Sequence, residues 1–295
     1  MKVAVHSEDI DGIACAALFL LVDPSASIKF LTVYEANETE EEFDFVADLP
    51  KCPKCKANID HHKSNLEKLI NSGRLSKKDL VDPSSPSAAF LVMKYFNLED
   101  NPVAREIVEI ANNADRGIFT EKTMLLDKII KLHMRDQNYL RKIAIILARK
   151  GSKFDSDEWF KKEAKKALSL LEEYSEILDT IVSEALSCGL TYVIFDVRGF
   201  PFFIAKDFAQ RFALSGGGVG ISIYIDPVTN KPRCSIRVSK SCEFHADKFA
   251  QKLGGGGHEK AAGAILYDPI DVIRHLINYV GDGKMIAYIK VPRRR

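Results

Sequence analysis

Three titratable side chains stand side by side in the segment ANIDHHKSN. Asp60, His61 and His62 directly follow the apolar Ile59. One carboxylate and two imidazoles are groups that bind divalent metal ions. An exposed polar turn has the same composition, so this segment alone leaves both interpretations open.

A second group of candidate ligands lies near the N-terminus, in the segment HSEDIDG. His6, Asp9 and Asp11 would face one point if the chain turned sharply, and Gly12 permits such a turn. By itself the segment is more typical of a solvated loop that leads into a helix N-cap. Other acidic residues of the chain are therefore needed to decide between a metal site and a solvated loop.

Asp48, in the segment VADLP, adds a further carboxylate to this set. Carboxylates with imidazoles suit Mn²⁺, Mg²⁺ or Zn²⁺, and several carboxylates in one crevice repel one another unless a cation lies between them. So many acidic residues indicate two cations. A paired site holds its metals about 3.5–4 Å apart, activates a bridging water molecule and neutralises a phosphate in the transition state.

The elements that would position these residues alternate between strand and helix. Strands are predicted over residues 1–5, 27–33, 43–48 and 56–60, and a helix over 13–22. This alternation indicates a parallel sheet with crossover connections, and ligands of such sheets collect at the carboxyl ends of the strands. Asp9, Asp11, Asp48 and Asp60 all lie where a predicted strand has ended.

Length and composition are those of an ordinary globular protein. The 295 residues suit two domains or one large one, with 46% hydrophobic and 28% charged residues. The formal net charge is +1, so a polyanion would have to be bound by a local patch. The apolar residues 13–22 follow an acidic flank and are too few to span a bilayer, which predicts a buried helix and no membrane association.

The six cysteines are scattered without the spacing of a disulfide framework. Free thiols in a reducing cytoplasm are the expected state. Cys52 and Cys55 have the spacing of a zinc knuckle, but no second pair stands near them, which favours a tight proline-containing loop. The C-terminal PRRR is interpreted as a solvated tail that could touch nucleic acid electrostatically.

The rest of the chain changes pattern twice. Residues 85–187 carry apolar residues at helical spacing, ending in a long amphipathic stretch over 157–186. Strands are then predicted over 190–196, 201–205, 219–226 and 233–239, the last two joined as a hairpin by the turn PVTNK. A helix over 246–253, the loop GGGGH and a strand over 260–267 complete a second α/β domain.

Five segments in order carry a resemblance to a known family. HSEDIDG, VADLP, IDHH and ANNADRGIF resemble successive motifs of the DHH phosphoesterase superfamily, and CSIRVS with KLGGGGHEKAAGA resembles its DHH-associated domain. The superfamily includes RecJ-type nucleases, short-oligonucleotide and pAp hydrolases, cyclic-dinucleotide phosphodiesterases and manganese pyrophosphatases. The resemblance spans residues 6–263 and favours the nuclease and phosphodiesterase branch.

The resemblance implies a fold and a domain division. We expect an α/β protein with an N-terminal parallel-sheet DHH catalytic domain (1–150), a long helical connector (151–188) and a smaller DHH-associated substrate-binding domain (189–295). The active site is expected in the cleft between the two domains. It would hold two divalent cations, Mn²⁺ first, with Mg²⁺ and Co²⁺ as alternatives.

Specific roles follow from the same motifs. One cation would be held by His6, Asp9 and Asp48, and the other by Asp11, Asp48, His61 and Asp115. Asp60 would orient an imidazole, a common arrangement for metal-bound histidines, and His62 would face the substrate phosphate. The first motif has one residue fewer than usual between His6 and Asp9, so the resemblance defines His6 least.

The second domain offers candidate phosphate-binding groups. A lone strand arginine is more often a surface charge, and a glycine run is more often a flexible loop. The resemblance implies instead that Arg237, Ser235 and the loop of Gly254, Gly255, Gly256, Gly257 and His258 bind the substrate, with His258 stabilising the scissile phosphate. Forked guanidinium donors and glycine backbone N–H groups are both suited to phosphate.

The resulting prediction is a cytoplasmic, Mn²⁺-dependent phosphodiesterase. It would act as an exonuclease on single-stranded RNA or DNA or on short oligonucleotides and release mononucleotides. A pAp phosphatase or a phosphodiesterase for cyclic or linear dinucleotides is the alternative, and an inactive nucleic-acid-binding scaffold is a further one. A homodimer and protein partners are left open.

Overall fold

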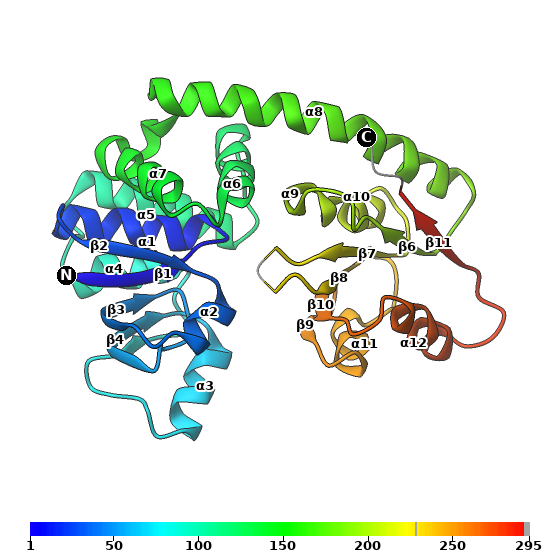
Figure 1. The fold of residues 1–295 in the computed structure, drawn as a ribbon, viewed down its shortest axis with the longest axis horizontal. Coiled ribbons are helices and arrows are strands. Elements are labelled where there is room, and N and C mark those ends of the chain that lie inside the picture. The colour runs from blue at the N-terminus through cyan, green and yellow to red at the C-terminus, as the bar shows by residue number, and fades with distance from the viewer. Residues whose placement is uncertain (228, 292–295) are drawn as a thin grey trace. The chain divides into compact units, whose positions relative to one another are not determined.

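The computed structural model describes residues 1–227 and 229–291. The chain divides into two compact units, Met1–Leu168 and Ser169–Arg295, which meet within the long helix α8 (Glu158–Ser187) (Figure 1). The predicted tail PRRR lies outside the described residues, as does Val228 of the predicted turn PVTNK. The two units are described separately below.

The first unit is built on a five-stranded sheet in the order β2-β1-β3-β4-β5. All of its strand pairs are parallel, as the alternation of strands and helices predicted. The strands are β1 (Lys2–His6), β2 (Ser27–Leu31), β3 (Glu42–Ala47), β4 (Lys54–Asp60) and β5 (Leu80–Val81). The short β5 was not predicted.

Helices surround this sheet (Figure 1). They are α1 (Ile10–Val22), α2 (Val33–Glu38), α3 (Lys63–Asn71), α4 (Ala88–Tyr95), α5 (Pro102–Asp115), α6 (Glu121–His133), α7 (Gln137–Lys150), the 3-10 helix η1 (Gly151–Ser156) and α8. Helix α1 packs against α4, α5 and α7 and is buried along most of its length, which confirms the interpretation of residues 13–22.

Gly12 has a different role from the predicted one. It lies in the first turn of α1, so it makes no sharp turn. A Cβ at this position would lie 2.1 Å from the backbone oxygen of His6. Glycine is therefore needed because the start of α1 passes directly against the end of β1, which draws Asp9 and Asp11 over the sheet edge.

The second unit is built on a six-stranded sheet in the order β11-β6-β7-β8-β10-β9. Its strands are β6 (Tyr192–Asp196), β7 (Val219–Ile225), β8 (Pro232–Val238), β9 (Gly256–His258), β10 (Ala261–Ile265) and β11 (Ile286–Lys290). Its helices are α9 (Phe202–Ala205), α10 (Asp207–Leu214), α11 (Ala246–Lys252) and α12 (Ile270–Val280). Strands β7 and β8 pair antiparallel, as the hairpin prediction required.

Two predictions for this unit were wrong. Residues 202–205 of the strand predicted over 201–205 form the helix α9. The prediction failed because a short aromatic run has no periodicity that separates a strand from a helix. The expected loop GGGGH is a strand over its last three residues, since β9 pairs with β10. Strand β11 and helix α12 were not predicted.

Two further properties concern membrane-spanning helices and the pair of cysteines at 52 and 55. Among the described helices, none is both long enough and apolar enough to cross a membrane. Cys52 is fully buried, and burial raises the pKa of its thiol to about 12 and that of Cys55 to about 11.

We predict that Gly12→Ala destabilises the protein by about 1–3 kcal/mol, because the new methyl group overlaps the His6 carbonyl and forces the start of α1 away from β1. Gly73→Ala is the matched control in the same unit. Its Cβ meets nothing within 4 Å, and only its φ of +66° carries a cost. Urea denaturation measures both, and a Gly12→Ala protein as stable as wild type would contradict the close approach.

Candidate metal centre

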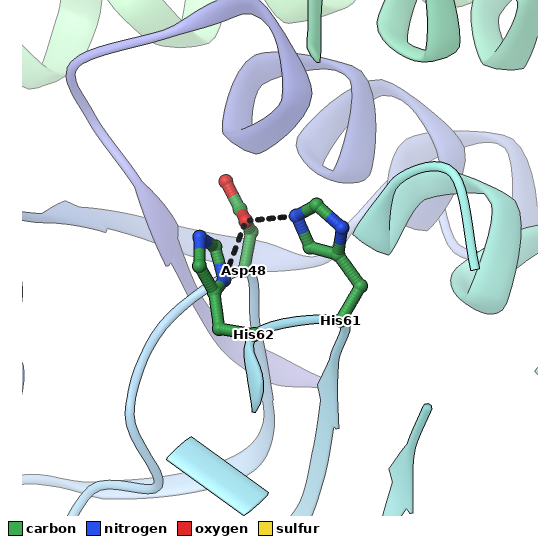
Figure 2. Close-up of side chains that lie close together, drawn as sticks. All are labelled: Asp48, His61 and His62. Carbon is green, nitrogen blue, oxygen red and sulfur yellow. Dashed lines mark ion pairs between the residues drawn. The ribbon is translucent and has the colours of Figure 1, made fainter. Parts of the chain in front are cut away.

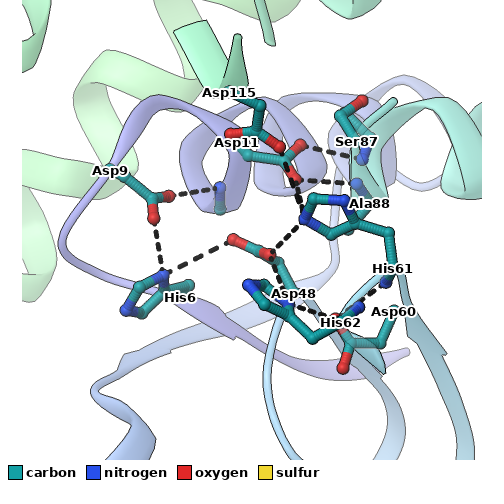
Figure 3. A network of polar contacts seen from close by, with 12 residues as sticks. His6, Asp9, Asp11, Asp48, Asp60, His61, His62, Ser87, Ala88 and Asp115 are labelled. Carbon is teal, nitrogen blue, oxygen red and sulfur yellow. Dashed lines mark hydrogen bonds and ion pairs between the residues drawn. The ribbon is translucent and has the colours of Figure 1, made fainter. Parts of the chain in front are cut away.

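The predicted ligands of the first unit gather at the carboxyl edge of its sheet (Figure 3). His6 ends β1, Asp48 directly follows β3, and Asp60 ends β4. Asp115 is the last residue of α5 and reaches the same point from a helix. Parallel strands therefore deliver ligands that are far apart in the sequence to one place.

His61 contacts three of these carboxylates. Its Nε2 lies 3.3 Å from Oδ2 of Asp115 and 3.7 Å from both Oδ2 of Asp11 and Oδ1 of Asp48. Two ligands that each lie about 2.1 Å from one ion are themselves roughly 3–4 Å apart. The arrangement around His61 therefore has the dimensions of a coordination sphere.

His6 forms a second centre of contacts. Its Nδ1 lies 2.8 Å from Oδ2 of Asp9 and 3.5 Å from Oδ2 of Asp48. Its other nitrogen lies 3.6 Å from Oε2 of Glu8, a residue that sequence reasoning missed because one more acid in HSEDIDG carried no separate signal. Despite these short distances, neither ring nitrogen has the alignment of a hydrogen bond.

Asp48 stands between the two histidine centres (Figure 3). Its Oδ1 lies 3.7 Å from His61 Nε2 and 3.8 Å from His62 Nδ1 (Figure 2), while its Oδ2 faces His6. The side chain is buried, and Oδ2 has no hydrogen-bond partner among the described residues. A buried carboxylate oxygen without a donor is costly, and a cation would remove that cost.

The backbone of Asp48 is also unusual. Its φ is +57°, in the left-handed region, where Asp is among the few tolerated residues apart from glycine. A hydrogen bond of 3.0 Å from its N–H to the carbonyl of Ile59 ties this strained position to β4. Strain of this kind persists where the surrounding structure enforces it, and it is concentrated at functional sites.

Asp60 is buried but already satisfied by donors. Its Oδ1 accepts hydrogen bonds from the backbone of His61 at 2.8 Å and from Nδ1 of His62 at 2.8 Å, and its Oδ2 accepts one from Asn65 at 2.5 Å. These bonds hold the His62 ring in one orientation. Sequence reasoning missed Asn65, which lies on α3, because an asparagine past a predicted site carries no distinguishing pattern.

Two other aspartates of the site lie close to helix ends. Asp11 accepts hydrogen bonds of 2.7 and 2.9 Å from the backbone N–H groups of Ala88 and Ala89, at the positive N-terminus of α4. Asp115 stands instead in the last turn of α5, where the helix dipole is negative. Its charge is disfavoured there unless a cation is close.

Burial and mutual repulsion shift the titration of these acids. Burial, together with Asp9, raises the pKa of Asp11 from 3.8 to about 7. Burial, together with Asp11 and Asp9, raises the pKa of Asp115 to about 8 and that of Asp48 well above its usual range. Without metal ions these carboxylates are therefore reluctant to ionise together, as expected when like charges share a site.

The pKa values of the three histidines are shifted in different directions. Burial would lower the pKa of His6, but Asp9, Asp48 and Glu8 together raise it well above its usual value. Burial and the neighbouring His62 lower the pKa of His61, which favours the neutral, metal-binding form. The hydrogen bond to Asp60 raises the pKa of His62.

The donor set fits divalent cations. Three groups place their ligand atoms within 4.8 Å of one another: His6, Asp9 and Asp48; Asp48, His61 and His62; and Asp11, His61 and Asp115. Asp48 and His61 each belong to two groups, so the three groups form one connected centre. Carboxylates with imidazoles suit Mn²⁺, Mg²⁺ or Zn²⁺, and the unpartnered Oδ2 of Asp48 is available to bind one.

The candidate substrate-binding residues all lie in the second unit. Arg237 on β8 is opposite Ala261 on β10, which in turn is opposite His258 on β9. Ser235 lies two residues before Arg237 on β8. The two motifs of this unit therefore meet across three neighbouring strands.

The glycines of this segment are closely packed. A Cβ on Gly255 would lie 2.2 Å from the backbone oxygen of Gly263, and one on Gly257 would lie 2.5 Å from the Cα of Ala262. Gly254 and Gly257 also have positive φ values. Most of the run therefore needs glycine for its own conformation, whether or not it binds a ligand.

Comparisons with solved structures identify the fold. A pGpG-specific phosphodiesterase (PggH) from Vibrio cholerae is similar with a TM-score of 0.59 at 18% identity, covering 95% of this chain and 98% of that chain. RecJ from Thermus thermophilus, in complex with Mn²⁺, is similar with a TM-score of 0.54 at 12% identity, covering 98% of this chain and 54% of RecJ. No protein-family profile and no curated protein matches the sequence.

These likenesses show the fold of the chain. It has the two-domain α/β fold of these two proteins, as the sequence predicted.

We predict that Mn²⁺ raises the melting temperature of the metal-free protein, and by more at pH 8 than at pH 6. Asp11 and Asp115 have pKa values of about 7 and 8 in the folded state against 3.8 when unfolded. Raised acid pKa values destabilise the metal-free fold as pH rises from about 4 through these values. Metal binding also competes with protons for the same oxygens, so its stabilisation grows over that range.

Thermal unfolding with and without Mn²⁺ at the two pH values tests this. Asp79→Asn is the control, because Asp79 is a buried aspartate of the same unit that is paired with Lys51. It should lower stability but leave the Mn²⁺ response intact. A wild-type shift that is absent, or equal at both pH values, would contradict a metal centre built from these acids.

Proposed function

We propose that the protein is a metal-dependent phosphodiesterase that cleaves single-stranded nucleic acid or short oligonucleotides from an end and releases mononucleotides. The observation that carries this proposal is the position of Asp48, whose two oxygens face His6 on one side and His61 with His62 on the other. One carboxylate between two groups of ligands is suited to bridging a pair of cations, Mn²⁺ first among them.

The residues of the site would have separate roles in hydrolysis. When bound, two cations would lower the pKa of a water molecule and offset the charge of the phosphate. His6 and Asp9 would hold one cation and Asp11, His61 and Asp115 the other, with Asp48 shared. These ligands need little rearrangement, because strand and helix ends already hold them in place.

His62 and Asp60 would act on the substrate side. The raised pKa of His62 keeps its ring charged to a higher pH than an ordinary histidine. A cationic imidazole fixed by Asp60 can donate from Nε2 to a phosphate oxygen. Asp60 would serve as a positioning residue, since its oxygens already accept hydrogen bonds from the protein.

In the second unit, Arg237 is suited to binding an anionic substrate. This guanidinium is partly buried, its hydrogen bond at 2.9 Å goes to the carbonyl of Ile236, and it forms no ion pair with a described carboxylate. Burial lowers its pKa, which Tyr224 and Asp207 only partly offset. A buried cation without an anion is expected where a ligand supplies the missing charge. His258 would add a further donor to the phosphate.

The structural relatives bear on the choice of substrate. One is described as a pGpG-specific phosphodiesterase, which names a linear dinucleotide as its substrate, and the other is RecJ in complex with Mn²⁺. A phosphodiesterase for cyclic or linear dinucleotides, or a pAp phosphatase, would use the same metal centre.

We predict that the wild-type protein with Mn²⁺ shortens end-labelled single-stranded RNA or DNA stepwise, and that Asp48→Ala abolishes this. Loss of Asp48 removes the ligand shared by both metal positions. The same assay should include pAp and cyclic di-AMP as small substrates, and gel electrophoresis and chromatography report the products. The Asp79→Asn protein is the control for a buried aspartate outside the centre.

Each outcome of that assay is informative. Stepwise shortening gives an exonuclease and, from the label, its direction. Turnover of only the small nucleotides would replace the exonuclease with the dinucleotide or pAp alternative. No turnover by a protein that retains bound Mn²⁺ would contradict the enzymatic proposal and favour a nucleic-acid-binding scaffold.

We also predict that Arg237→Met weakens binding of a terminal nucleotide at least tenfold while leaving stability unchanged or slightly higher. An unpaired, partly buried cation stabilises the fold little, so an apolar side chain of similar length removes a cost. Titration calorimetry and urea denaturation measure the two effects. Unchanged affinity would contradict a substrate role for Arg237, and a large loss of stability would make the role structural.

A further inference from the structure

The first unit has a small pocket beside the metal centre. Its volume is about 60 Å³, which gives room for about four to six water-sized groups of roughly 10–15 Å³ each. The pocket lies between one face of α3, the loop that joins β3 to β4, and the segment after α3. Its lining includes Lys51, Asn65, Lys68, Leu69, Ser72 and Arg74.

Arg74 is anchored in a way that leaves part of its guanidinium able to bind an anion. Its Nη2 donates to the carbonyl of Lys51 at 3.2 Å and to that of Cys52 at 2.9 Å. A guanidinium has five N–H donors, and the three on Nε and Nη1 have no partner among the described residues. An arginine fixed by two carbonyls presents its other donors as a rigid fork, which suits an oxyanion.

The charges of the pocket are positive and only partly compensated. Lys51 is neutralised, because its ammonium group donates twice to the buried Asp79 and once to the carbonyl of Arg74. Lys68 and Arg74 form no ion pair with a described carboxylate, and no acidic residue lies three or four positions from Lys68 on α3. Two uncompensated cations therefore line a pocket that no described carboxylate lines.

Asn65 is the buried polar residue of the pocket and connects it to the metal centre. The residue is 8% exposed, and its Nδ2 donates to Oδ2 of Asp60 at 2.5 Å. An amide nitrogen has two hydrogens, and this bond uses one of them. Asp60 in turn holds the ring of His62. An anion in the pocket would therefore contact a residue that supports the metal centre, without sharing a metal ligand with it.

The C-terminus of α3 does not prevent anion binding. Free carbonyls at the end of a helix carry partial negative charge and disfavour an anion. The last carbonyls of α3 already accept hydrogen bonds of 3.0–3.1 Å from the backbone N–H groups of Ser72, Gly73 and Arg74. The α3 residues that line the pocket are also spaced by three and four positions, so the pocket lies along the side of the helix.

We propose that this pocket binds a free tetrahedral oxyanion of the size of inorganic phosphate. Its volume accommodates four oxygens around one centre and leaves no room for a sugar or a base. Inorganic phosphate is a mixture of the monoanion and the dianion at pH 7, so two cations can neutralise it. Arg74 would donate from Nε and Nη1, Lys68 would act as a point charge, and Asn65 would donate its second amide hydrogen.

This inference does not depend on the proposed function, because the pocket contains neither a metal ligand nor a residue of the second unit. Arg237 of the second unit is itself a candidate phosphate-binding residue, so the test uses Arg237→Met as the background. The ligand is inorganic phosphate and the protein is the metal-free full-length chain.

Titration calorimetry should show that phosphate binds the Arg237→Met protein, and that adding Lys68→Gln weakens this binding about tenfold through loss of a charge-assisted contact. The side chain of Lys68 forms no hydrogen bond with a described residue, so this variant should fold normally. Lys77→Gln is the matched control, since it removes a lysine charge from an exposed position after α3 that does not line the pocket. Its phosphate affinity should be unchanged.

AMP separates a free ion from the phosphate of a nucleotide. It carries a nucleoside that the pocket cannot hold, so it should bind the Arg237→Met protein more weakly than phosphate does. Three results would overturn the inference: phosphate binding that is absent from the Arg237→Met protein, affinity that is unchanged by Lys68→Gln, or AMP binding that is tighter than phosphate binding and equally dependent on Lys68. The last result would assign the pocket to a nucleotide.

Discussion

The site in the first unit is governed by a cluster of carboxylates that cannot all be ionised at once without a cation. Asp9, Asp11, Asp48 and Asp115 meet at one edge of a parallel sheet, and burial with mutual repulsion raises the pKa of three of them. A protein that maintains such a cluster loses stability at neutral pH. Divalent cations that bind these carboxylates would remove their repulsion and stabilise the folded protein, which is the simplest reason for the arrangement.

The fold meets this constraint by fixing the ligands separately. Helix α4 holds Asp11 through backbone N–H groups, and Asp60 holds His62 through a hydrogen bond. Gly12 allows α1 to start directly against β1, which brings Asp9 close to His6. Asp48 is left with a buried oxygen that no described donor satisfies, and it lies between the other ligands. Preorganisation of this kind is what a rigid metal centre requires.

Much of the fold could be predicted from the sequence because its signals are local. Alternating strands and helices predicted the parallel sheet, and acids directly after the strands predicted where a site would lie. The order of the motifs predicted a two-domain α/β fold, although the sequence matches no family profile. Strand ends carry side chains to a known edge of a sheet, so these expectations needed no distances.

Other features had no local signal. The contact of Gly12 with the His6 carbonyl and the bond from Asn65 to Asp60 exist only after folding. Residues 201–205 were predicted as a strand because five apolar residues have no distinguishing period. The oxyanion pocket depends on Arg74, whose contacts with the carbonyls of Lys51 and Cys52 likewise exist only after folding.

The central claim is that Asp48 bridges two cations, and anomalous diffraction from crystals of the full-length protein grown with Mn²⁺ tests it most directly. The account predicts two manganese peaks about 3.5–4 Å apart with the Asp48 carboxylate between them. His6 and Asp9 should lie on one side, and His61 and Asp115 on the other. A single peak, or peaks away from Asp48, would contradict a two-metal centre at this edge of the sheet.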